Sequence, residues 1–206
     1  MAEQILSAAL LKSLTARLGE DAARPLFAQV SIASAGVAAE NGAAMTREAA
    51  SESARFGGDG SAHFSRRLTE ADVQGADLVL GMAREHRSAI VALDPKSARI
   101  AFTLTEFARL VTAPRMLDDI EPFDGDVFKG KDLAGFLRAL VATIALSRGY
   151  VPPMAPKELD IADPYGQSGR TYARVGTVIG EATTTLAASL VGAIAAPSVV
   201  TVMRDT

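Results

Sequence analysis

The sequence predicts an α/β fold in which a parallel sheet is covered by helices on both faces. Short apolar segments alternate with longer segments of helical periodicity, which is typical of strand–helix–strand units that build parallel sheets. The first element is a helix that ends near Gly19, because its apolar residues are spaced three and four apart up to that point. Residues 76–82 and 100–102 are short apolar runs and predict two buried strands of the sheet.

Between these elements the sequence predicts one more strand and two capped helices. Residues 27–33 form a short, partly β-branched run that leads into a turn at residues 34–36, so we expect a strand there. Residues 46–56 and 69–75 each begin with a threonine placed to cap a helix. The glycines of residues 57–60 are interpreted as a flexible connector, because no strand leads into them as a phosphate-binding loop requires.

The remainder of the chain predicts three more helices and a proline-rich linker. Helices are expected over residues 84–93 and 133–149 and, with a long one-faced pattern, over residues 172–190. Residues 152–156 contain three prolines and are expected to be extended.

The length of 206 residues indicates one domain. We expect it to comprise residues 1–196, with an insertion at about 114–156 and a loosely held C-terminal tail at 197–206. The insertion opens with an acidic stretch that could bind a cation, although a solvated loop is preferred because the twelve-residue calcium-loop pattern is absent. Its acidic residues are Asp118, Asp119, Glu121, Asp124 and Asp126.

The composition excludes several classes of function. The net charge is -3 and no run of lysine or arginine forms a basic stripe, so nucleic-acid binding is not expected. The 206 residues contain no cysteine, which excludes disulfides, thiolate metal sites and cysteine nucleophiles within them and is compatible with a cytoplasmic location. With two histidines and scattered carboxylates, we expect no metal site and no cofactor.

One uncharged segment, residues 183–203, is long enough to cross a bilayer. Its threonines, alanines, glycine and proline keep its hydrophobicity modest, and its first part continues the one-faced pattern of the preceding helix. We therefore interpret it as part of a buried helix and expect no association with a membrane.

The best candidate for chemistry is the stretch from Asp163 to Gly166. Pro164 disfavours the helical conformation for Asp163, so that this carboxylate is presented from a rigid turn just before a helix. A carboxylate in such a place is a candidate general acid that donates a proton to a leaving oxygen. The alternative is that Asp163 and Pro164 form an ordinary loop dipeptide.

Four segments, taken in order, resemble the low-molecular-weight protein tyrosine phosphatase family, the phosphotyrosine protein phosphatase I type. They are Met1 to Glu3, the turn at residues 34–36, the segment around His63, and Asp163 to Gly166. The resemblance covers about residues 1–112 and 158–190. It implies a three-layer sandwich with a four-stranded sheet in the order two-one-three-four.

The resemblance also implies a reaction and the roles of three residues. The reaction is the hydrolysis of phosphotyrosine in a protein substrate. Asp163 would protonate the leaving phenolate and then help to activate water, Tyr165 would flank the phosphotyrosine ring, and His63 would brace the phosphate loop. The alternative for His63 is a histidine bonded to nearby backbone. Asp160 is a neighbour to which no chemical step is assigned.

The family's most specific motif has no counterpart in the 206 residues. In the family, a first strand and a Cys-x5-Arg-Ser-Pro loop come directly before the residues that Met1 to Glu3 resemble. The cysteine thiolate attacks phosphorus from within a ring of backbone N–H groups, and the arginine clamps the phosphoryl oxygens. Ser31 and Ser34 have no adjacent base in sequence and are not expected to replace it. A chain of these 206 residues is therefore expected not to hydrolyse aryl phosphates by this mechanism.

Two interpretations follow. We prefer a misassigned start at Met1, in which case the native product carries the upstream loop and is an active tyrosine phosphatase. The other is a catalytically inactive, phosphatase-like binding or regulatory module, with a homodimer through the open sheet as one arrangement, because a sheet that lacks its first strand has an unpaired edge. An arsenate reductase of the same fold is disfavoured, because it needs several further cysteines.

Overall fold

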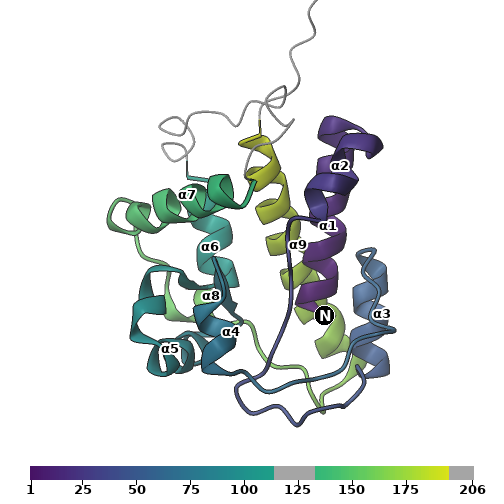
Figure 1. The fold of residues 1–206 in the computed structure, drawn as a ribbon. Coiled ribbons are helices and arrows are strands. Elements are labelled where there is room, and N and C mark those ends of the chain that lie inside the picture. Colours follow the sequence, from purple (N-terminus) through teal and green to yellow (C-terminus); the bar gives the residue numbers. More distant parts are fainter. Residues whose placement is uncertain (114–132, 195–206) are drawn as a thin grey trace, which may run out of the picture.

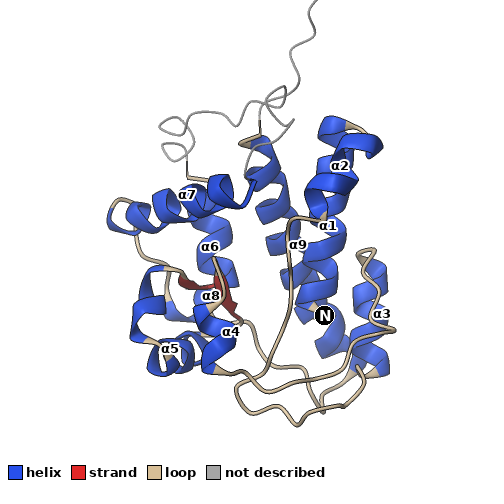
Figure 2. Cartoon of the chain, in the orientation of Figure 1, coloured by secondary structure: helices blue, strands red, loops and turns tan. Residues whose placement is uncertain are grey.

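A computed structural model of the protein describes residues 1–113 and 133–194, and within them helices surround a short parallel sheet (Figures 1 and 2). The strands are β1 (Val79–Gly81) and β2 (Ala101–Thr103). The helices are α1 (Ala2–Leu18), α2 (Glu20–Phe27), α3 (Arg47–Arg55), α4 (Glu70–Gln74), α5 (Arg84–Leu93), α6 (Leu104–Val111), α7 (Leu133–Leu146), α8 (Pro156–Leu159) and α9 (Gly169–Gly192), with short 3-10 turns η1 (Pro95–Arg99) and η3 (Ser147–Gly149).

The two strands separate two layers of helices. Val79 lies opposite Ala101 and Leu80 opposite Phe102 in parallel register. Because successive side chains of a strand point to opposite faces, Leu80 and Phe102 share one face while Val79 and Ala101 share the other. The first pair belongs to the main apolar core, and the second pair packs with residues of α4 and α5. The predicted α/β fold with helices on both faces of a parallel sheet is confirmed.

The main core is built from four helices on the face of Leu80 and Phe102. Ile5 of α1, Phe107 of α6, Ile144 of α7 and Ile179 of α9 are all buried there around Phe102. Helices α1 and α9 run side by side along this layer (Figure 1). The start of α1 is thereby held in the main core beside α9, which matters for the site described below.

Several helix boundaries lie where the sequence places them. Thr46 accepts a hydrogen bond from the backbone N–H of Ala49, and Thr69 and Asp72 form a reciprocal capping box at the start of α4. Helix α1 ends before Gly19, whose φ of 81° is in the region that favours glycine. The predicted caps and the predicted stop are therefore confirmed.

The strand predicted over residues 27–33 is wrong. Phe27 is the last residue of α2, which starts immediately after Gly19 and buries Leu26 against α1. Burial of an apolar helix face thus outweighs the β-branched composition of this run. Residues 28–35 form no regular strand and lead to an isolated parallel bridge between Gly36 and Arg67.

The inserted segment is part of the core rather than an appendage. Leu140, Val141 and Ile144 of α7 are buried in the main cluster, and the helix predicted over residues 133–149 is confirmed, with its last turn as η3. The acidic stretch at residues 118–126 and the predicted tail at 197–206 lie outside the described residues.

Arg148 of η3 ties the insertion to the sheet. Its Nε and Nη2 donate to the two carboxylate oxygens of Glu106 at 2.8 and 3.1 Å, and its Nη1 and Nη2 donate to the carbonyls of Ala98 and Ala101 at 3.2 and 2.7 Å. The guanidinium also stacks 3.7 Å above the ring of Phe102. A planar, five-donor cation suits this bidentate and stacked arrangement.

Helix α9 is the one helix of the described residues that is long and apolar enough to cross a membrane. Its apolar face is nevertheless occupied within the protein, because Val175, Ile179 and Leu186 are buried in the main core and Val191 packs with α1 and α2. A core helix passes the same test of length and composition, so this helix gives only weak evidence for a membrane span.

We predict that Arg148→Ala destabilises the fold. The change removes the cation that pairs with the partly buried Glu106 carboxylate and leaves the Ala98 carbonyl without its side-chain donor, whereas the Ala101 carbonyl keeps its bond from Arg87, so the free energy of unfolding should fall by about 2–4 kcal/mol. Denaturant unfolding monitored by circular dichroism measures it. Arg24→Ala is the matched control, because the exposed pair of Arg24 with Glu20 is worth about 0–1 kcal/mol. Equal losses for the two variants would contradict this role of Arg148.

Candidate active site

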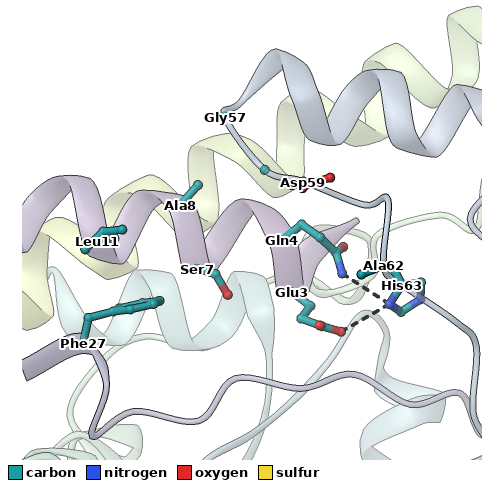
Figure 3. A pocket seen from close by; sticks show the side chains of 11 residues that line it. Glu3, Gln4, Ser7, Ala8, Leu11, Phe27, Gly57, Asp59, Ala62 and His63 are labelled. Atoms are coloured by element: carbon teal, nitrogen blue, oxygen red, sulfur yellow. Dashed lines mark hydrogen bonds and ion pairs between the residues drawn. The ribbon is translucent and has the colours of Figure 1, made fainter. Parts of the chain in front are cut away.

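Three segments meet at the first turn of α1. The Ser34 hydroxyl donates to Glu3 Oε2 at 2.5 Å. His63 Nδ1 lies 3.6 Å from the same oxygen (Figure 3). His63 Nδ1 is also 3.3 Å from Gln4 Nε2. The turn at residues 34–36 and the segment around His63 are therefore both attached to the start of the first helix.

The contacts of His63 with α1 involve one ring nitrogen. The tautomer of the ring decides whether Nδ1 donates or accepts in the bond with the Gln4 side-chain amide. Gln4 is buried, and its Oε1 is the one buried side-chain oxygen of the described residues that has no hydrogen-bond partner. The imidazole of His63 thus contacts side chains of α1, whereas the backbone contact of this residue is the donation of its N–H to Gly60.

The glycine loop at residues 57–60 packs closely on α1 and borders a hollow of about 340 Å³. A Cβ on Gly58 would come within 2.8 Å of the Gln4 Cβ, so only glycine allows this approach. The predicted connector is confirmed as a loop. The hollow is lined by Glu3, Gln4, Ser7, Ala8, Leu11, Phe27, Gly57, Gly58, Asp59, Ala62 and His63.

The segment after His63 is bound to the turn at residues 34–36 by backbone hydrogen bonds. Gly36 N–H donates to the Arg66 carbonyl and the Gly36 carbonyl accepts from Leu68 N–H, both at 3.0 Å. Arg66 in turn donates to Asp72 of the α4 capping box at 2.6 Å. The position of Ser34 and Gly36 thus depends on the start of α4.

Asp72 is held as a carboxylate. Hydrogen bonds from the Thr69 hydroxyl, from Arg66 and from the Thr69 backbone lower the pKa of Asp72 to about 2. The charge therefore persists well below the usual titration range of an aspartate.

A second group of residues lies at the C-terminal end of β1. Asp160 accepts from the Arg84 backbone N–H at 2.8 Å and from the Arg84 guanidinium at 2.8–3.2 Å, and these bonds lower the pKa of Asp160. The N–H of Ile161 donates to the Met82 carbonyl at 2.8 Å. The sequence analysis assigned Asp160 no role. The feature that could have indicated one is the helix that starts at Arg84, because a carboxylate is favourable beside a helix N-terminus.

Asp163 follows these anchors on an exposed turn. Its Oδ1 accepts from the Tyr165 N–H at 3.0 Å, and Gly166 has a φ of 73° that continues the turn into α9. The Tyr165 side chain is 75% exposed. Asp160 and Asp163 line a second hollow of about 380 Å³ together with residues of α5. The turn presents both predicted side chains to solvent at the end of the sheet.

The structure does not bring the three predicted site residues into one cavity. His63 lines the first hollow and Asp163 the second, and the residues that line the two do not overlap. Figure 1 nevertheless shows the segment between α8 and α9 and the loops around α3 at the same end of the molecule as the N-terminus of α1. Ligands of open parallel sheets bind outside the carboxyl ends of the strands, and the second hollow lies there.

This fold and these anchored segments define a phosphatase-like α/β domain. Residues 5–130 match the sequence model of the family described as low molecular weight phosphotyrosine protein phosphatase. The chain belongs to this family. The matched residues include His63 but do not reach Asp163 or Tyr165, whose roles remain predictions. No curated protein matches the chain.

Solved structures show the same fold at low identity. Vibrio vulnificus Wzb in complex with benzylphosphonate is 18% identical, with 90% of this chain and 88% of that chain covered and a TM-score of 0.52. The YwlE arginine phosphatase of Geobacillus stearothermophilus is 22% identical over 90% and 82%, also with a TM-score of 0.52. The low molecular weight protein tyrosine phosphatase of T. tengcongensis is 23% identical over 89% and 88%, with a TM-score of 0.52.

We predict that Asp72 contributes stability that is lost in acid. Its folded-state pKa of about 2 is below the unfolded value, so the contribution is present above about pH 4 and is lost as the pH falls toward 2. Allowing for solvent screening, Asp72→Asn should lower the free energy of unfolding at pH 7 by about 1 kcal/mol. It should also flatten the decline in stability between pH 4 and 2.

Urea unfolding at several pH values measures both effects. Glu20→Gln is the control, because the carboxylate of Glu20 is exposed and bonds only Arg24 one helical turn away. An Asp72→Asn variant with wild-type stability at pH 7 would show that the capping box does not support the start of α4.

Proposed function

We propose that this chain forms the body of a cytoplasmic protein tyrosine phosphatase, which hydrolyses phosphotyrosine monoesters once a Cys-x5-Arg loop is joined to α1. Family membership and fold support the phosphatase class. The observation that carries the proposal is the anchoring of the Asp163 segment, because Asp160 and Ile161 bind the residues just beyond β1. The carboxylate is thereby presented where parallel sheets bind ligands.

The electrostatics of the segment favour Asp163 over Asp160 as the acid. Asp160 is bound by the Arg84 guanidinium and an N–H group, which lower its pKa and keep it deprotonated. A deprotonated, hydrogen-bonded carboxylate has no proton to donate to a leaving phenolate. Asp163, by contrast, is exposed on its turn and accepts one hydrogen bond, from the Tyr165 backbone N–H, and no cation is paired with it in the described part of the chain.

The proposed reaction has two steps. A thiolate at the amino end of α1 attacks phosphorus, the bond to the phenolate oxygen breaks, and Asp163 transfers its proton to that oxygen. The same carboxylate then takes a proton from water, which attacks the phosphocysteine and releases phosphate. Tyr165 would form one wall of the cleft, and His63 would support the loop through α1 and Gln4.

The second candidate is a catalytically inactive binding or regulatory module. The observation that favours it is the complete absence of cysteine from the 206 residues.

A homodimer through the sheet fits this alternative. Val79 N–H donates to the Ile100 carbonyl, so the backbone groups of Val79 face β2. Alternate residues of a strand form hydrogen bonds toward opposite sides. Leu80 therefore directs its N–H and carbonyl toward the edge of β1 that faces away from β2. Among the described residues no hydrogen bond occupies those two groups.

We predict that Asp163→Asn in the protein isolated from its own cells lowers kcat for an aryl phosphate by about 100-fold or more, because general-acid catalysis is worth that much. The acid limb of the pH–rate profile should change with it. Tyr165→Ala should raise KM for a phosphotyrosine peptide more than for a phosphoarginine peptide, because only the former has a ring to flank. Steady-state kinetics with the three substrates measures these effects.

Glu181→Gln is the matched control, since it also neutralises an exposed carboxylate but lies on α9. Wild-type kcat in Asp163→Asn would remove Asp163 from the mechanism. Complete inactivity of the wild-type protein toward all three substrates would instead favour the inactive module.

A further inference from the structure

The connection between η3 and α8 is an exposed, proline-rich segment that neither hollow uses. It has the sequence Val-Pro-Pro-Met-Ala-Pro over residues 151–156. Pro152, Pro153 and Pro156 are exposed, and the Tyr150 side chain just before them is 87% exposed. The segment belongs to the insertion, outside the residues that resemble the family. The proposed catalytic function therefore does not explain it.

The sequence itself holds this backbone extended. A proline fixes its own φ near −65° and disfavours the helical conformation of the residue before it. Val151, Pro152 and Ala155 each precede a proline. Ala155 has φ −63° and ψ 145°, close to the polyproline II values of about −75° and +145°. Ala155 therefore has the conformation that polyproline-binding grooves select, and the following prolines restrict Val151 and Pro152 toward it.

Both ends of the segment are anchored. Val151 N–H donates to the Ser147 carbonyl at 3.1 Å, next to the Arg148 contacts with the sheet. At the other end, Ala155 N–H donates to Glu158 Oε2 at 2.9 Å, and the Leu159 carbonyl accepts from Thr105 of α6 at 3.0 Å. The exposed prolines are thus displayed from a fixed base.

Between these anchors the polar groups are available. No hydrogen bond within the described structure uses the carbonyls of Pro152, Pro153 or Met154. Pro153 and Pro156 are three residues apart, which is the spacing of one polyproline II turn, and Pro156 is also the first residue of α8. Lys157 follows in α8 as an exposed cation, and it makes no ion pair or side-chain hydrogen bond in the described part of the chain.

We propose that residues 150–157 are a docking segment for a partner protein whose polyproline-binding groove is lined by aromatic side chains and has a carboxylate near one end. The aromatic rings would pack on Pro153 and Pro156, and the O–H or N–H groups of tyrosine or tryptophan side chains among them would donate hydrogen bonds to the free carbonyls. The carboxylate would attract Lys157. Because the segment lines neither hollow, this docking is separate from the proposed reaction.

The test is a titration of the full-length, 15N-labelled chain with a panel of isolated SH3 and WW domains. We expect at least one domain to shift the backbone amide resonances of the non-proline residues in this segment saturably. In the variant with Pro153→Ala and Pro156→Ala, the affinity should fall at least tenfold. Pro95→Ala is the matched control, since Pro95 starts η1 and lies outside the segment. It should bind as wild type.

Circular dichroism and melting temperature establish that the double variant is folded. Lys157→Ala provides a second measurement, because it changes no proline. It should weaken binding several-fold, and the affinity of this variant should depend less on salt concentration than the affinity of the wild type. Saturable binding elsewhere on the chain, equal affinity for the double variant, or no binding by any domain of the panel would overturn the proposal.

Discussion

The burial of Phe102 is the constraint on which the rest of the structure depends. Its ring is fully buried, stands edge-on to Phe107 with centroids 4.8 Å apart, and carries the Arg148 guanidinium on one face. Through it, a strand of three residues organises helices from distant parts of the chain. A sheet this short has few ladder hydrogen bonds. Side-chain packing, reinforced by the partly buried pair of Arg148 with Glu106, must therefore supply most of the order.

The proposed site comprises two separately anchored groups of residues. One is the start of α1, where Glu3 and Gln4 engage Ser34 and His63. The other is the segment beyond β1, where the ion pair of Asp160 with Arg84 precedes the exposed Asp163. Backbone and side-chain hydrogen bonds fix both groups, whereas the side chains proposed to act on substrate remain accessible. Such a division is expected of a site whose geometry is set before the substrate arrives.

Much of the fold and part of the site could be predicted from the sequence, because the responsible signals are local. The threonine caps of α3 and α4 and the stop at Gly19 need only neighbouring residues. The strand predicted over residues 27–33 was wrong because burial of Leu26 against α1 is a tertiary effect. The attachment of Arg148 and the role of Asp160 join residues 42 and 76 positions apart, which no local pattern reveals.

The central claim is that a thiolate supplied ahead of α1 completes this phosphatase body. Its most direct test combines intact-mass and peptide mass spectrometry of the protein isolated from its own cells with an aryl-phosphate assay before and after iodoacetate. We predict that the isolated protein contains Cys-x5-Arg and loses its turnover when that cysteine is alkylated. Turnover by a protein that has no cysteine, and that iodoacetate leaves unchanged, would contradict the claim.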